Sequence, residues 1–331
     1  RTSGHWTGTQ CSDGGSRRRA GAVARDLSKF VAAEKALWSK YGITPTERRV
    51  KLRAGNEVRI QEVGDGPPLV FIHGVVVAGS SWVLLADALK NDFRCLLVDR
   101  PGCGLSDPIP GGPTQTSDEF KRSADELTVD VLDGLGLETA PVACTSMGGF
   151  FGLRGAIASP DRITKVVSYS WPMGSPMTNV PMMMRLGSPR LMRALMIRMP
   201  IGAPAVKMMF KQVGLKRALE TGAFDDDMIA WSIAVMKHTE TFRSETQNNP
   251  FIALRGLNPE VLLTDEELAR LRSPVLLLWG EEDTNAGEPE AKAFAARLPD
   301  ATLEIVRKAG HAPWIDELDF CAAKTRAILS T

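Results

Sequence analysis

The sequence predicts an α/β protein with a mostly parallel sheet that is covered by helices on both faces. Short apolar strand segments alternate with helical segments along most of the 331 residues, which is the pattern of this fold class. A segment at residues 172–264 interrupts the alternation, because it holds twelve of the thirteen methionines together with several prolines. We expect an inserted helical subdomain there, between two strands of the core.

The first elements are a helix and a hairpin. Asp26 is a candidate cap for a short amphipathic helix that ends at Tyr41-Gly42. Strands at 48–52 and 57–63 follow, joined by a glycine turn. The remaining core elements alternate as strands and helices: strand 69–72, helix 82–89, strand 95–98, helix 117–135, strand 141–144, helix 147–158, strands 163–168 and 275–279, helix 289–298, strand 302–306 and a terminal helix.

The domain organisation follows from these patterns. Residues 1–25 are rich in Gly, Ser and Arg and carry no apolar pattern, so we expect a disordered tail. Residues 26–171 and 265–331 form the predicted α/β core, and residues 172–264 form the predicted helical cap. No apolar run is long enough to span a membrane.

Composition excludes several function classes. Forty basic and thirty-nine acidic side chains give a net charge of +1, so no global field attracts nucleic acid. The five cysteines form no CxxC pair, which favours reduced thiols and a cytoplasmic protein. The four histidines lack metal-ligand spacing, and no glycine pattern fits a dinucleotide site. We therefore expect neither a metal nor another cofactor.

A serine in a tight turn is the candidate nucleophile. The segment Val142-Ala143-Cys144-Thr145-Ser146-Met147-Gly148-Gly149 is a predicted strand, then a turn, then the small residues that open a helix. This is the pattern of a nucleophile elbow, except that Cys144 occupies the position of the first glycine. The turn would lift the Ser146 hydroxyl out of the sheet, at the N-terminus of the helix.

Candidate partners for this serine follow in the order that its chemistry requires. Asp283 comes just after strand 275–279, and His311 just after strand 302–306. Ligands of open α/β sheets bind at these carboxyl ends of strands. Histidine can take the proton of Ser146, and a buried carboxylate can hold the histidine in the required tautomer.

A site for developing negative charge is also predictable. Strand 69–72 ends in His73-Gly74-Val75, so the backbone N–H groups of Val75 and Met147 could form an oxyanion hole. His73 is a competing candidate for the catalytic base. We favour a role for it in bracing the loop by hydrogen bonds, since His311 already supplies a base.

With these motifs the chain resembles enzymes of the α/β-hydrolase fold. Other matching stretches run from Asp99 to Asp107, from Gly280 to Asp283 and from Gly310 to Trp314. The resemblance covers residues 45–331 and implies an eight-stranded sheet with a cap after the sixth strand. It also implies the catalytic triad Ser146, Asp283 and His311, with Asp283 preferred to Glu281 and Glu282 by the family spacing.

The resemblance leaves the substrate open. The triad favours a serine esterase that cleaves a small apolar carboxylic ester through an acyl-enzyme, and we expect Gly74, Trp171, Met173 and Met177 to contact this substrate. The first alternative is carbon–carbon bond hydrolysis of ring-fission products, whose enzymes often place tryptophan directly after the histidine, whereas here two residues separate Trp314 from His311. The second is a non-catalytic ligand-binding receptor of the same fold.

The predicted cap has an unusual charge balance. Between 172 and 224 the sequence has eight basic residues and one acid, Glu220, which gives 8 − 1 = +7. The arginines suit the solvated faces of cap helices, but they also suit contact with an anionic substrate or lipid surface. Asp225-Asp226-Asp227 resembles a cation site, and we interpret it as a helix N-terminus instead.

Overall fold

An eight-stranded sheet lies at the centre of the protein. The computed structural model describes residues 26–112, 114, 116–187, 189–247, 252–253 and 256–330, so the predicted tail at 1–25 lies outside the described residues. The strand order is β1-β2-β4-β3-β5-β6-β9-β10. β2 is antiparallel to both its neighbours and every other pair is parallel, which confirms the predicted sheet. The strands are β1 (Thr46–Lys51), β2 (Glu57–Val63), β3 (Pro68–Ile72), β4 (Arg94–Val98), β5 (Ala140–Thr145), β6 (Ile163–Tyr169), β9 (Val275–Gly280) and β10 (Ala301–Val306).

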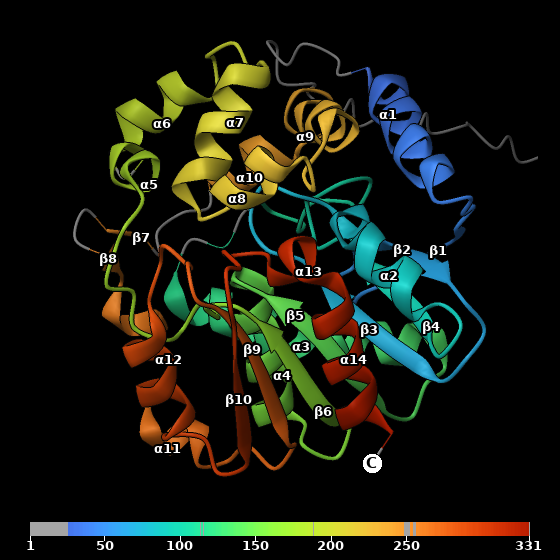
Figure 1. Cartoon of the computed structure of the whole chain (residues 1–331), viewed down its shortest axis with the longest axis vertical. Coiled ribbons are helices and arrows are strands. Elements are labelled where there is room, and N and C mark those ends of the chain that lie inside the picture. Colours follow the sequence, from blue (N-terminus) through green and yellow to red (C-terminus); the bar gives the residue numbers. More distant parts are fainter. Residues whose placement is uncertain are drawn as a thin grey trace, which may run out of the picture.

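Helices cover both faces of this sheet (Figure 1). In β3, Leu69 and Phe71 belong to one core cluster while Val70 and Ile72 belong to the other, so alternate side chains of the strand are buried on opposite faces. The covering helices include α2 (Val83–Leu89), preceded by the short 3-10 helix η1 (Gly79–Trp82), and α3 (Ser117–Leu135), α4 (Met147–Ala158), α12 (Glu288–Ala295), α13 (Pro313–Asp316) and α14 (Leu318–Leu329).

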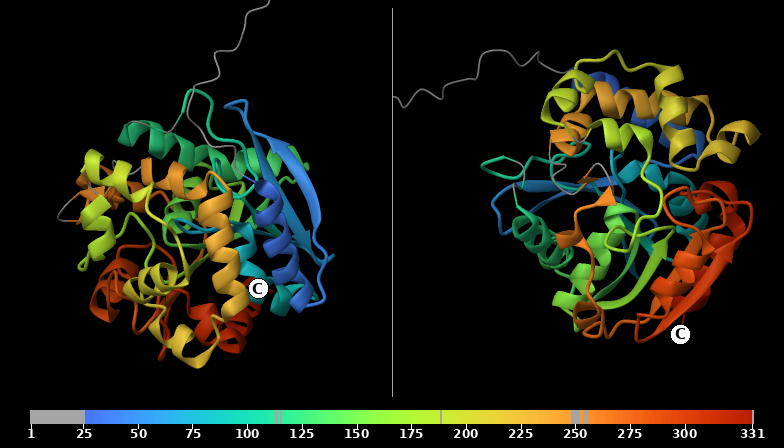
Figure 2. Two further views of the ribbon diagram at one scale, coloured as in Figure 1. Left: turned by 90° about the horizontal axis from the view of Figure 1, so that it is seen from above. Right: turned by 90° about the vertical axis from the view of Figure 1, so that its left-hand side faces the viewer.

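The cap is inserted between β6 and β9 and lies over the carboxyl ends of the strands (Figures 1 and 2). Its helices are α5 (Met182–Gly187), α6 (Arg190–Met196), α7 (Ala203–Gln212), α8 (Lys216–Thr221), α9 (Asp226–His238) and α10 (Thr241–Gln247). The sequence predicted no strand here, but β7 (Ile252–Ala253) and β8 (Gly256–Leu257) form a short antiparallel pair. They are too short to show the alternation that identifies a strand. The 3-10 helix η2 (Pro259–Val261) and helix α11 (Asp265–Leu268) return the chain to the core.

Helix α1 (Leu27–Lys40) joins the core to the cap. On the core side, Glu34 accepts two hydrogen bonds from the Arg59 guanidinium, at 2.7 and 2.8 Å, and a third from the Ser80 hydroxyl at 2.6 Å. On the cap side, α1 packs along α9, and Lys40 forms an ion pair with Asp225. Asp26 caps the helix as predicted, with its carboxylate accepting from the Ser28 N–H.

The three consecutive aspartates mark a helix start, as the sequence predicted. Asp225 accepts a hydrogen bond from the Met228 N–H at 3.0 Å and is the N-cap of α9. Within the described ranges, no cluster of His, Cys, Asp and Glu could hold a metal ion. No helix in the same part of the chain is both long and apolar enough to cross a membrane.

Candidate active site

Ser146 occupies the sharp turn between β5 and α4. Its backbone φ of 54° is in the left-handed region, which costs free energy for any residue other than glycine and is typical of a functional turn. Glycines let the next helix approach the sheet closely. A Cβ at position 148 would lie 2.1 Å from the Ile72 carbonyl oxygen, which no packing could accommodate. The turn therefore positions the serine at the end of β5, as predicted.

Cys144 is accommodated without a positive φ in the position where the pattern has glycine. Its side chain is fully buried, and its Sγ lies 3.6 Å from the Val167 carbonyl oxygen. The space comes from Gly152 on α4, where a Cβ would lie 2.7 Å from that sulfur.

Asp283 and His311 are paired. Asp283 Oδ2 lies 2.9 Å from His311 Nδ1, and the carboxylate is fully buried while the imidazole is 13% exposed. The pairing fixes the proton on Nδ1 and leaves Nε2 as the basic nitrogen. Ser146 and His311 line the same pocket. The structure thus brings together all three residues of the predicted triad.

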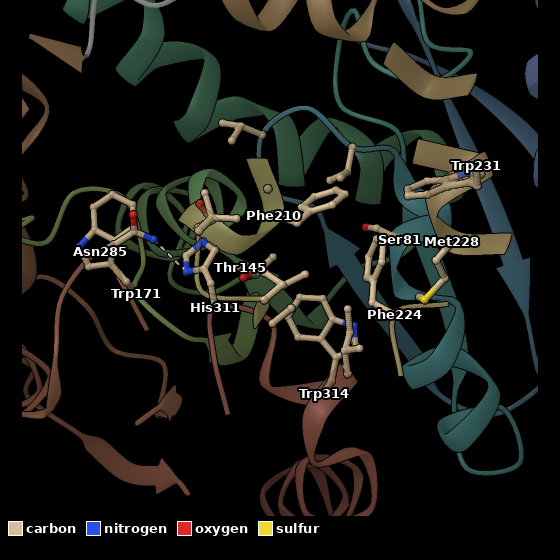
Figure 3. Close-up of a pocket in the computed structure, with 18 of the residues that line it drawn as sticks. Ser81, Thr145, Trp171, Phe210, Phe224, Met228, Trp231, Asn285, His311 and Trp314 are labelled. Atoms are coloured by element: carbon tan, nitrogen blue, oxygen red, sulfur yellow. Dashed lines mark hydrogen bonds between the residues drawn. The ribbon is translucent and has the colours of Figure 1, made fainter. Parts of the chain in front are cut away.

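Two further groups hold the Asp283 carboxylate. The Trp171 N–H donates to Oδ2 at 2.9 Å, and the Asn285 backbone N–H donates to Oδ1 at 2.9 Å. The Asn285 side-chain nitrogen lies 3.2 Å from Oδ1 and 3.0 Å from His311 Nδ1 (Figure 3). Sequence analysis missed Asn285, although its position two residues after the predicted acid could have drawn attention to it.

Two backbone donors remain available beside Ser146. Val75 lines the pocket after β3, and Met147 begins α4. Among the described residues, no acceptor takes a hydrogen bond from the N–H of either one. Unsatisfied N–H groups next to a candidate nucleophile are what an oxyanion hole requires.

His73 braces the loop that carries Val75. Its Nε2 accepts from the Arg100 N–H at 3.0 Å, and its Nδ1 lies 2.7 Å from the Gly74 carbonyl oxygen, so Nδ1 carries the proton. Complete burial, with Arg100 nearby, holds the pKa of His73 well below its usual value. Arg100 also donates to the carbonyl oxygens of His73 and Gly74. These contacts agree with the predicted structural role.

The pocket over Ser146 is apolar. Counted with its open mouth, it has a volume of about 810 Å³. Figure 3 shows His311, Asn285 and Trp171 at one end and Met228, Trp231 and Phe224 at the other. None of the described lining residues is Asp, Glu, Lys or Arg; they are Leu37, Gly74, Val75, Val77, Ser80, Ser81, Thr145, Ser146, Trp171, Met184, Phe210, Val213, Leu215, Phe224, Met228, Trp231, Asn285, His311, Ala312, Trp314 and Ile315.

Two of the four predicted substrate contacts line the pocket. Gly74 and Trp171 line the pocket, but Met173 and Met177 are not among its described lining residues. Met173 is 3% exposed and packs in the core cluster that contains Phe150, and Met177 packs against the same cluster. This corrects the expectation, because the chain after β6 turns these two side chains toward the core. Met184 and Met228 line the pocket instead.

The sheet, the cap and the elbow serine together define the class of protein. A model of the alpha/beta hydrolase family matches residues 69–324, so the chain belongs to the α/β hydrolase family. A naproxen esterase from Bacillus subtilis has a similar structure, with a TM-score of 0.73 at 19% identity over 91% of this chain and 97% of that one.

Curated relatives act on more than one kind of bond. A 2-hydroxy-6-oxononadienedioate/2-hydroxy-6-oxononatrienedioate hydrolase from Cupriavidus pinatubonensis is 25% identical over 81% of this chain and 90% of its own. A pimeloyl-[acyl-carrier protein] methyl ester esterase from Aeromonas hydrophila is 28% identical over 78% of this chain and 93% of its own. The family therefore establishes a hydrolase fold and leaves the bond and the substrate to be argued from the site.

Proposed function

We propose that this protein hydrolyses an uncharged, apolar carboxylic ester through an acyl-enzyme on Ser146. The observation that carries this proposal is the absence of Lys, Arg, Asp and Glu among the described residues of the pocket. A neutral ester can be buried there at little electrostatic cost. A carboxylate buried without a cationic partner would lose its hydration without compensation.

In the proposed reaction His311 Nε2 takes the proton of Ser146 as the hydroxyl oxygen attacks the ester carbonyl. The N–H groups of Val75 and Met147 stabilise the oxyanion, and Asp283 stabilises the imidazolium. The tetrahedral intermediate expels the alcohol, which takes the proton from His311. Water then attacks the acyl-enzyme with His311 again as base, and the acid is released.

The resting site leaves the nucleophile available. In the described part of the chain the Ser146 hydroxyl donates to no other group, so it faces the pocket without a competing hydrogen bond. The hydrogen bond to a catalytic histidine often tightens only when substrate is bound. Trp171 and Thr145 border the serine from the carboxyl ends of β6 and β5.

Carbon–carbon bond hydrolysis is the second candidate, and it is favoured by the name of the relative from Cupriavidus. The substrate in that name is a dianion with two carboxylates. The pocket described here offers no guanidinium or ammonium group to either one. This contrast makes the ester the first choice.

The test compares nitrophenyl esters of increasing acyl length with 2-hydroxy-6-oxo-6-phenylhexa-2,4-dienoate. We expect turnover of the apolar esters and little turnover of the dienoate. Ser146→Ala should lose ester turnover by several orders of magnitude and should no longer react with a serine-directed phosphonate. Ser81→Ala, which changes another pocket serine, is the matched control and should still be labelled. Turnover of the dienoate alone would replace this proposal with carbon–carbon cleavage, and tight ligand binding without any turnover would indicate a receptor.

A further inference from the structure

The outer surface of the cap exposes large apolar side chains. Leu191 is 85% exposed and Leu195 is 55% exposed, both on α6. Elsewhere in the described chain only Leu27, Val31 and Phe320 are large, apolar and comparably exposed. We call the cap set the outer cap face; its apolar members are Met182, Leu191, Met192, Leu195, Met199 and Met208.

The outer cap face contains four of the twelve methionines of the inserted segment. Met182, Met192, Met199 and Met208 point to solvent, whereas Met184 lines the pocket. Large exposed apolar side chains that gather in one part of a protein mark a binding surface more often than a packing defect. Figure 1 shows α5, α6 and α7 together at the outer edge of the cap, away from the sheet.

Basic side chains accompany this apolar surface. From 172 to 219 the sequence contains no acidic residue. Arg185, Arg198 and Lys211 are exposed, and in the described part of the chain none of them forms an ion pair with a carboxylate. Other cations of the cap do have such partners, since Lys207 lies 3.7 Å from Asp226 and Arg217 lies 2.8 Å from Glu317.

The same helices also border the pocket. Helix α5 carries Met184 in the pocket and Met182 and Arg185 on the outside, and α7 carries Phe210 in the pocket and Met208 outside. A molecule that contacts the outer cap face is therefore one helix thickness from the pocket.

We propose that the outer cap face docks on an anionic lipid surface. Its leucines and methionines would enter the interface, and the neighbouring Arg185, Arg198 and Lys211 would contact the lipid phosphates. Amphipathic surfaces that combine large apolar side chains with Lys and Arg bind such interfaces. A second copy of this chain is a poorer occupant, because a symmetric contact would place the same cations against each other. The docking itself does not depend on the proposed function. Only the idea that docking would deliver apolar esters from the lipid to the pocket rests on it.

The experiment measures sedimentation of Ser146→Ala protein with vesicles, so that turnover plays no part. One set of vesicles has equal parts of phosphatidylglycerol and phosphatidylcholine, and the other has phosphatidylcholine alone. We expect binding to the first set, weakened by salt, and little binding to the second. Arg185→Gln with Arg198→Gln should weaken binding roughly 25-fold, on the basis of about fivefold for each cation.

A second variant, Leu191→Ser with Leu195→Ser, removes apolar side chains from the same face and should also weaken binding. Matched controls outside the outer cap face are Phe320→Ser on α14 and Arg272→Gln, whose side chain is 73% exposed near the amino end of β9. Controls that lose as much binding as the cap variants would overturn the proposal, and so would equal binding to both vesicle types. Self-association that disappears in the leucine variant, without vesicle binding, would assign the face to a second copy instead. The same four surface variants are also made in protein that keeps Ser146, and their hydrolysis of a short soluble ester should stay unchanged. This second assay separates failure of docking from failure of the proposed function.

Discussion

The backbone N–H of Trp171 donates to Asp283 Oδ2 at 2.9 Å, and the same oxygen lies 2.9 Å from His311 Nδ1. The residues that end β6 and follow it include no acid, yet this segment takes part in the site through its main chain. Because a main-chain donor persists in any substitution except proline, the orientation of the carboxylate depends little on the side chain at 171. The carboxylate of Asp283, which follows β9, is thus held by the segment that follows the neighbouring strand β6.

Asp283→Asn should lower kcat by roughly 10³–10⁴-fold while the protein remains folded, because the amide can no longer hold His311 in the required tautomer. Ester turnover and a thermal unfolding curve check both halves of this expectation. Glu282→Gln is the matched control, since Glu282 is exposed and adjacent. Near-normal turnover in Asp283→Asn, with loss in Glu282→Gln, would move the acid by one position.

Asn285→Ala should lower kcat by roughly 10–100-fold, with a smaller change in KM. The side-chain nitrogen donates to the Asp283 carboxylate at 3.2 Å and lies beside His311, and a hydrogen bond to a charged group contributes about 1.5–3 kcal/mol. The pH dependence of kcat should shift as well, because a purely structural asparagine would leave it unchanged. Asn258→Ala, a substitution outside the pocket at the start of η2, serves as the control. Equal kinetics in the two variants would remove Asn285 from the catalytic arrangement.

Leu37→Ala should shift the preferred ester toward longer acyl chains. Leu37 comes from α1, is 1% exposed and lines the pocket, and its helix packs on α9, which carries Met228 and Trp231. Removing this much apolar volume should change kcat/KM for long relative to short esters by roughly tenfold, at a stability cost of about 2–5 kcal/mol. Leu27→Ala, at the exposed start of the same helix, should change neither. An unchanged chain-length profile would show that Leu37 does not limit the pocket.

Acidification should destabilise the protein in part through His73. Burial lowers the pKa of His73 in the folded state, so below the unfolded value of about 6.5 the unfolded chain binds the extra proton and the folded chain does not. Its contribution is thus full above that pH and is lost as the pH falls, by up to about 1.4 kcal/mol per pH unit. His73→Gln should be less stable at neutral pH but should lose less on acidification, as followed by urea unfolding. Parallel losses in both proteins would contradict this account.

Local signals made much of the core predictable. Helix α3 begins at 117 because Thr116 and Glu119 form a capping box, and α4 begins at 147 because the strained Ser146 turn ends the strand. The candidate residues Ser146 and His311 followed from the order of strand ends, whereas the preference for Asp283 over the two neighbouring glutamates came from the family spacing. The bounds of β2 and α4 agree with the predictions for the same reason, since apolar periodicity and turn residues act over short distances.

Other features depend on contacts between distant parts of the chain. Nothing near Leu37 in the sequence indicates that it lines the pocket, because its place depends on the packing of α1 against α9. Likewise, composition identified the methionines of 172–264 as apolar but could not show which of them point outward. The contact of Glu34 with Arg59 and Ser80 is of the same kind, since twenty-five or more residues separate the partners.

Helix α1 has a mechanical consequence for access to Ser146. The cap is already continuous with the core at both its ends, and α1 adds a third attachment, because its Glu34 binds the core and the helix packs against α9 of the cap. A cap held to the core at three places is restricted in its rigid-body motion. Substrate should therefore enter by rotation of side chains at the pocket mouth while the cap helices stay in place, and amide hydrogen exchange in α9 should become faster when Glu34 no longer holds α1 to the core.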